Sequence, residues 1–162
     1  MLFFRQYFRY GFAMFVLIAL TALQASGVVS FFGIVPNLAL SALVALFFYF
    51  KSFGEILLFS GAAASVLNWT RGIPWELAAF LAAVAAAFLL KKLTPWHVVL
   101  ELAFLAGAAS LLFALFADVS YPFSFPWRFG VELLYAELAA FLSLGLLMLF
   151  YGAPQERDLS RI

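Results

Sequence analysis

Six long apolar stretches fill almost the whole of this chain of 162 residues, and only short polar gaps separate them. Hydrophobic residues make up 67% of the sequence, whereas charged residues make up 10%. A water-soluble domain of this size needs more polar surface to cover its outside, so a lipid bilayer is the solvent that fits. We therefore expect an all-α, polytopic membrane protein with six transmembrane helices, in one integral membrane domain comprising residues 1–162.

The apolar stretches place the expected spans. The third is only about 15 residues, or about 22 Å as a helix, and so is shorter than a hydrocarbon core of about 30 Å. It either spans a thinned bilayer, is shielded by neighbouring helices, or is partly re-entrant. The six expected spans are residues 11–29, 34–50, 55–69, 75–90, 96–117 and 131–151.

Basic residues are concentrated in alternate gaps between these spans, and only Arg71 and Arg128 lie in the other gaps. Basic residues in short loops are retained in the cytoplasm, so we expect both termini to be cytoplasmic. If the third segment failed to cross, Lys91 and Lys92 would move to the outer side, which favours the six-span arrangement. The seven basic residues on the expected inner side are Arg5, Arg9, Lys51, Lys91, Lys92, Arg157 and Arg161.

Residue types that support chemistry are scarce. The chain has no cysteine and a single histidine, His97, so we expect no disulfide, no metal site and no cofactor. The net charge of +1 comes from nine basic and eight acidic residues, which leaves no charged patch for nucleic acid. The sequence contains no Ser-His-Asp arrangement and no phosphate-binding glycine loop. We therefore predict a protein without enzymatic activity, with membrane lipids among its partners.

Small residues recur every four positions on two of the expected helices. In a bilayer this spacing lets helix backbones approach closely. Two interpretations stay open: the small residues pack helices within the bundle, which we favour, or one ladder faces a partner subunit. The residues are Gly61 and Ser65 on the third segment and Ala78, Ala82 and Ala86 on the fourth, with Ala79, Ala83 and Ala87 beside them.

Polar residues in or beside the spans are candidates for contact with a partner or ligand, because a charge at the bilayer centre costs about 2.5–3.5 kcal/mol on insertion scales. Glu137 lies nearly two turns into the sixth span, so it is protonated, pairs with Arg71 across helices, or binds a partner group. Glu101 fits a local ion pair near the cytoplasmic interface. The candidate set comprises Glu137, Glu132, Arg128, Arg71, Glu76 and Asn68.

Four residues have the properties of turn and cap builders. Pro36 suits the first turn of a helix, where its missing N–H would have no partner anyway. Asn37 can then accept hydrogen bonds from free backbone N–H groups. Gly72 permits a tight turn, and Pro74 prepares the chain to enter the fourth helix.

Short motifs in the first half of the chain carry a family resemblance. Residues 23–26 read Leu-Gln-Ala-Ser, and residues 32–38 read Phe-Gly-Ile-Val-Pro-Asn-Leu. They resemble the start of MreD-family proteins, small rod-shape-determining membrane proteins of bacteria. The family's next signature, Asp-Leu-Leu-x-Gly-x-Pro-x-Gly, is similar to residues 68–76. Gly72 and Pro74 keep its spacing, but asparagine replaces the aspartate and glutamate replaces the last glycine.

This resemblance implies a non-enzymatic scaffold subunit of the bacterial cell-elongation machinery, which directs peptidoglycan synthesis and rod shape, in the cytoplasmic (inner) membrane. Such proteins associate with the bitopic protein MreC and through it with peptidoglycan synthases. The implied fold is similar to that of the substrate-binding subunits of energy-coupling-factor transporters. The alternative function is therefore a small-molecule (vitamin) binding subunit, with an outward cavity near Arg71, Glu76, Asn68, Arg128 and Glu132. The alanines of the first span lack the Ala-x-x-x-Ala docking patch of those subunits, which favours the scaffold.

Overall fold

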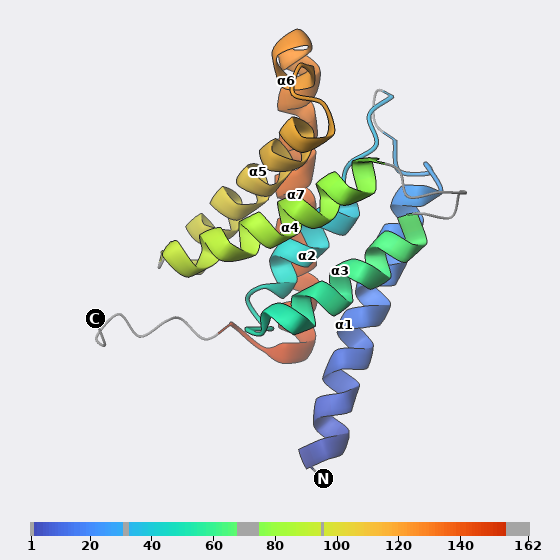
Figure 1. Ribbon diagram of the computed structural model, residues 1–162. Helices are drawn as coiled ribbons and strands as arrows, with labels where there is room; N and C mark the ends of the chain where they lie inside the picture. The colour runs from blue at the N-terminus through green and yellow to red at the C-terminus, as the bar shows by residue number, and fades with distance from the viewer. Residues whose placement is uncertain (1, 31–32, 68–74, 95, 155–162) are drawn as a thin grey trace.

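The computed structural model in Figure 1 describes residues 2–30, 33–67, 75–94 and 96–154. This described part is all-helical, as the sequence predicts, and contains no strand. Its helices are α1 (Leu2–Ala25), α2 (Leu38–Leu46), α3 (Phe53–Leu67), α4 (Trp75–Leu93), α5 (Val98–Ala117), α6 (Tyr121–Ser124) and α7 (Pro126–Tyr151).

Successive long helices run in alternating directions. In the view of Figure 1, α1, α3 and α5 rise, whereas α2, α4 and α7 descend, and the short α6 joins α5 to α7 at the top. The chain therefore begins α1 and ends α7 in the lower half of the view. We call the end of the bundle that contains α6 the upper end, and the end that contains the α2–α3 connection the lower end.

Helix α2 is the centre of the bundle. All nine of its residues are buried, because α1, α3, α4, α5 and α7 all pack against it. A helix that is hydrophobic all round is stable only when neighbours surround it, and α2 meets that condition. Ser41 also ties it to α7, since its hydroxyl donates a hydrogen bond of 2.9 Å to the carbonyl of Ala136.

Within the predicted second span, residues 34–50, the α-helix covers only Leu38–Leu46. Asn37 caps α2 as expected: its side-chain oxygen accepts a 3.1 Å hydrogen bond from the Leu40 N–H, one residue after Pro36. The helix ends at Leu46, where four consecutive aromatic residues begin and i→i+3 hydrogen bonds replace the α-helical pattern. The ammonium of Lys91, from α4, donates a hydrogen bond to the carbonyl of Phe47, which satisfies a backbone acceptor at this end.

Other helix boundaries also differ from the predicted ones, for local reasons. Helix α1 ends at Ala25, four residues before the predicted limit, because the chain turns at Gly27 with a φ of +66°. Helix α4 continues to Leu93 and so includes two lysines in its last turn, where positive charges interact favourably with the helix dipole. Helix α7 begins at Pro126, five residues earlier than predicted, since proline fits the first turn of a helix.

Three helices in the described residues are long and apolar enough to cross a membrane: the Tyr7–Ala25 part of α1, α5 and α7. Helix α4 has 19 residues but carries three charged side chains. With 9 and 15 residues, α2 and α3 fall short of the ~20 that a spanning helix needs. Large apolar side chains such as Phe15, Leu142 and Leu149 are exposed on the outside of the three long helices. These features indicate a membrane protein.

The predicted packing ladder on α4 is corrected by the structure. The buried alanines are Ala79, Ala83 and Ala87, one position along from the predicted set. Residues i and i+1 differ by about 100° around a helix, so only one of two adjacent ladders can face the core. In the predicted set, Ala78 and Ala82 are exposed and Ala86 is half-buried, and the predicted Gly61 and Ser65 of α3 are exposed as well.

Candidate functional site

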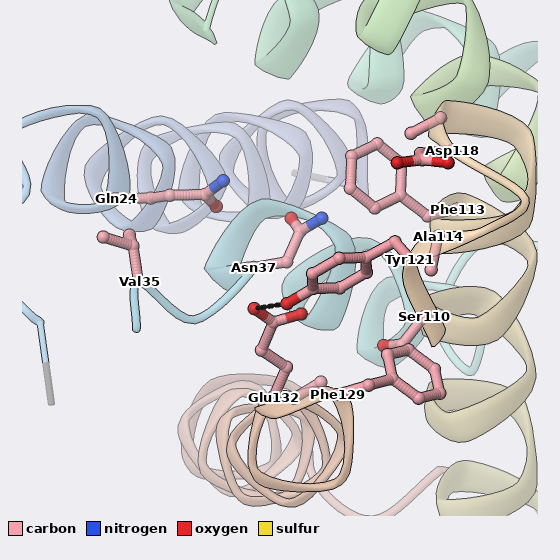
Figure 2. A pocket seen from close by; sticks show the side chains of 12 residues that line it. Gln24, Val35, Asn37, Ser110, Phe113, Ala114, Asp118, Tyr121, Phe129 and Glu132 are labelled. Atoms are coloured by element: carbon pink, nitrogen blue, oxygen red, sulfur yellow. Dashed lines mark hydrogen bonds between the residues drawn. The ribbon is translucent and has the colours of Figure 1, made fainter. Parts of the chain in front are cut away.

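A cavity of about 310 Å³ lies at the upper end of the bundle. It is enclosed by the end of α1, the α1–α2 connection, the last turns of α5, the α5–α6 turn, α6 and the first turns of α7 (Figure 2). Segments almost a hundred residues apart in sequence therefore build one site. Its lining residues are Gln24, Val35, Asn37, Ser110, Phe113, Ala114, Ala117, Asp118, Tyr121, Phe129, Glu132 and Ala136.

One wall of the cavity carries two amide side chains whose orientation is set by backbone donors. The oxygen of Gln24 accepts a 2.9 Å hydrogen bond from the N–H of Ala39, and the oxygen of Asn37 accepts one from Leu40. Because each oxygen is already engaged by a helix N-terminal N–H, the NH₂ group of each amide is the part available to the cavity. In Figure 2, Asn37 lies between Gln24 and Tyr121.

The opposite wall carries the carboxylates. The hydroxyl of Tyr121 donates a 2.5 Å hydrogen bond to Oε1 of Glu132, and Nε of Arg128 lies 3.7 Å from the same oxygen. Asp118 ends α5, and its Oδ1 accepts hydrogen bonds of 2.9 Å from the Ser120 N–H and 2.7 Å from the Ser120 hydroxyl. These bonds hold the pKa of Asp118 below its ordinary value, so this exposed side chain is a carboxylate at neutral pH.

Burial, followed by the hydrogen bond to Glu132, raises the pKa of Tyr121 to about 12. The phenol therefore stays protonated, and remains a hydrogen-bond donor, throughout the physiological range.

Tyr121→Phe is expected to lower stability by about 1 kcal/mol at pH 7–9, because it removes this hydrogen bond. Because the pKa of Tyr121 is higher in the folded state, its protonated phenol contributes its full stabilisation below the unfolded-state pKa of about 10. This contribution is lost as the pH rises toward 12. The difference from wild type should therefore shrink between pH 10 and 12. Denaturation of both proteins in detergent across this pH range measures the difference in stability. Tyr7→Phe, which changes an exposed tyrosine, is the control. A difference that is independent of pH would contradict the assignment.

Apart from Glu137, the predicted contact residues and the predicted turn and cap residues fall into three groups. Glu132 and the cap residue Asn37 line the cavity, next to the buried Pro36, while Arg128 sits outside it as the partner of Glu132. Glu76 is exposed in the first turn of α4 and does not line this cavity. Asn68, Arg71, Gly72 and Pro74 lie outside the described residues.

Glu137 packs inside the bundle, between α7 and α5. It is half-buried, and a Cβ added to Gly107 of α5 would lie 3.6 Å from its Oε1. This is an ordinary van der Waals distance, so the carboxyl side chain lies against α5 at this glycine. The predicted pairing of Glu137 with Arg71 falls on a residue that is not described.

Gln24, Asp118 and Tyr121 are polar residues of the cavity that were not predicted as site residues. Gln24 is the only strongly polar side chain in the last two turns of α1, which was the available signal. The Asp118–Ser120 pair resembles an ordinary turn in sequence, and only the tertiary arrangement places Asp118 in the same cavity as Gln24.

Comparisons with protein-family models, with curated proteins and with solved structures find no match to this chain.

Proposed function

We propose that this protein is a non-enzymatic scaffold subunit of the bacterial cell-elongation machinery, embedded in the cytoplasmic membrane with six spans and both termini inside. Its partners would be an MreC-like bitopic protein and, through it, peptidoglycan synthases. The proposal draws on the MreD-like motifs at residues 23–38 and 72–74 and on the helical bundle. A scaffold of this kind works by lateral helix contact in the bilayer.

The observation that favours lateral contact is the uncovered small-residue surface of α3 and α4. Gly61 and Ser65 of α3, like Ala78 and Ala82 of α4, are exposed, although the adjacent ladder on α4 is buried. The two helices pack against each other, and these pairs lie at similar numbers of residues from the connection that joins them. The Ser65 hydroxyl donates to the Gly61 carbonyl at 2.8 Å, so it needs no other partner. Small side chains whose polar groups already have hydrogen-bond partners let a partner helix approach closely.

The six-span topology draws support from the alternating directions of the helices (Figure 1). The short helix α2 is compatible with it because neighbours bury it over its whole length. Backbone at membrane depth is tolerated where protein covers it.

We expect cysteines at Ser52 and Leu93 to be protected from an impermeant thiol reagent added to intact cells, and a cysteine at Ser124 to react. All three positions are exposed, and the chain has no cysteine of its own. Permeabilised cells provide the control, since all three positions should then react. Labelling of Ser52 or Leu93 variants from outside would reject the proposed orientation.

Ala82→Phe is expected to reduce capture of an MreC-like protein at least tenfold in detergent pull-downs. A phenyl ring on the uncovered surface blocks close helix approach, while the exposed position leaves the fold intact. Ala19→Phe, at an exposed alanine of α1, is the matched control and should retain capture. Equal capture by both variants would show that α4 is not the contact surface, and the absence of any such partner would reject the scaffold.

The cavity favours a second candidate, a small-molecule (vitamin) binding subunit of an energy-coupling-factor transporter. It lies at the expected outer face and contains Glu132, one of the residues expected there. The two functions differ in their partner: co-purification with an ATPase-containing complex would support the transporter subunit and reject the scaffold.

A further inference from the structure

The dimensions of the upper cavity match a small ligand. Its volume of about 310 Å³ is at the lower limit of ligand pockets, which range over about 300–1,000 Å³. At ~30 Å³ per water molecule, this space corresponds to roughly ten non-hydrogen atoms. Exposed Val35 and Asp118 are at its edge, so a ligand can enter from the upper end of the bundle.

The charge of the cavity selects a cation. Two carboxylates, Asp118 and Glu132, are among its lining residues, and no lysine or arginine of the described residues lines it. Arg128 neutralises part of the Glu132 charge from outside, at 3.7 Å, which leaves the described lining with about one excess negative charge. Only one oxygen of each carboxylate accepts the hydrogen bonds and ion pair of the described residues: Oδ1 of Asp118 and Oε1 of Glu132. The second oxygen of each can accept from an ammonium group.

The remaining lining residues specify the rest of the ligand. The rings of Phe113, Phe129 and Tyr121 provide an apolar wall, and aromatic faces also attract cations. Across the cavity, Gln24 and Asn37 present amide NH₂ groups because their oxygens already accept backbone hydrogen bonds. Figure 2 shows Gln24 and Asp118 on opposite sides, with Asn37 and the Tyr121–Glu132 pair between them. A ligand spanning this distance needs an ammonium at one end and a hydrogen-bond acceptor at the other.

We infer that the upper cavity is a binding site for a small organic ammonium compound that carries a hydrogen-bond acceptor opposite its charge. Asp118 binds the ammonium, Glu132 adds a second negative charge to the cavity, the aromatic side chains contact the body of the ligand, and Gln24 and Asn37 donate to the acceptor. Two sources supply this chemistry: a soluble amine, and the ethanolamine headgroup of a phospholipid, in which the phosphate is the acceptor. The site does not depend on the scaffold role, because it lies at the upper end and is formed within a single chain.

Tyramine is a suitable probe, since it combines an ammonium, an aromatic body and a phenol oxygen in about the expected size. We expect the purified protein in nanodiscs of phosphatidylglycerol to bind tyramine by calorimetry. Tyrosol, which has a hydroxyl in place of the ammonium, should bind at least tenfold more weakly. Adding phosphatidylethanolamine to the nanodiscs distinguishes the sources: competition with tyramine identifies the lipid headgroup as a ligand, and unchanged binding identifies a soluble amine.

Asp118→Asn and Glu132→Gln should each weaken tyramine binding at least tenfold. Both variants keep an oxygen that accepts the internal hydrogen bonds from Ser120 and Tyr121, so the fold is retained. Glu55→Gln removes the same charge at the lower end and should bind as wild type does. Failure of the wild-type protein to bind tyramine, equal binding of tyrosol, or full binding by both cavity variants would overturn the inference. Because capture of a partner protein is measured separately, failure here is distinct from failure of the scaffold.

Discussion

Ala83→Leu is expected to lower the free energy of unfolding by about 1–3 kcal/mol, whereas Ala82→Leu leaves it nearly unchanged. Ala83 is 0% exposed and lies in the middle of the buried ladder of α4, so three additional carbon atoms have no space there. Ala82, the next residue, is exposed and can place a leucine against lipid. The two variants add identical atoms one residue apart, and unfolding in mixed micelles of denaturing detergent compares them.

This pair of variants also tests which ladder packs α4 into the bundle. Helix packing in a bilayer depends on close contact between helices, because lipid is as apolar as leucine. A leucine at position 83 therefore pushes α4 away from its neighbours, of which α5 makes the largest contact. A larger loss of stability for Ala82→Leu than for Ala83→Leu would mean that α4 is rotated by about one residue from the arrangement described.

Lys91→Met is expected to cost about 1–3 kcal/mol of stability, because the buried carbonyl of Phe47 loses its charged donor. Lys91 is 8% exposed, and its ammonium also lies 4.3 Å from the ring centroid of Phe48. Methionine keeps most of the aliphatic volume of lysine and removes the charge. The loss of stability therefore measures the contribution of the ammonium and not that of the packed aliphatic chain.

Lys92→Met is the matched control for this prediction. Lys92 is exposed and lies 5.4 Å from the ring centroid of Phe88, a contact worth less than about 1 kcal/mol at such a position. Thermal unfolding of the two variants in the same detergent should separate them clearly. Equal losses of stability would mean that any positive charge near the membrane boundary stabilises the protein, and that the hydrogen bond at the end of α2 makes no separate contribution.

Much of the helix order could be predicted from the sequence, for reasons that are local. Trp75 begins α4, Ala117 ends α5 and Tyr151 ends α7, at residues that also limit expected spans, because polar or turn-forming residues follow or precede the apolar runs there. The extent of α2 could not be predicted, since the apolar run continues without interruption through Phe50. Where every residue is apolar, periodicity gives no information about which part is helical.

The candidate site was harder to predict than the fold. Glu132 was accessible to sequence reasoning because an ionisable residue in an apolar helix stands out. Gln24 lies in α1 and Asp118 follows the last residue of α5, so their presence in one cavity depends on how the helices pack around α2. The choice between two adjacent alanine ladders is of the same kind: the sequence contains both, and only the tertiary arrangement decides that Ala83 is buried and Ala82 is not.

The position of α2 has a consequence for biogenesis. This helix emerges early from the ribosome, yet in the folded protein it packs against α7, which is synthesised about ninety residues later. The hydrogen bond between Ser41 and Ala136 joins residues 95 positions apart. Until α7 arrives, a nine-residue segment too short to cross the lipid alone must be held by the insertion machinery or by α1. Truncation before α7 would therefore leave the middle of the protein unassembled, which makes complete translation a condition for stable insertion.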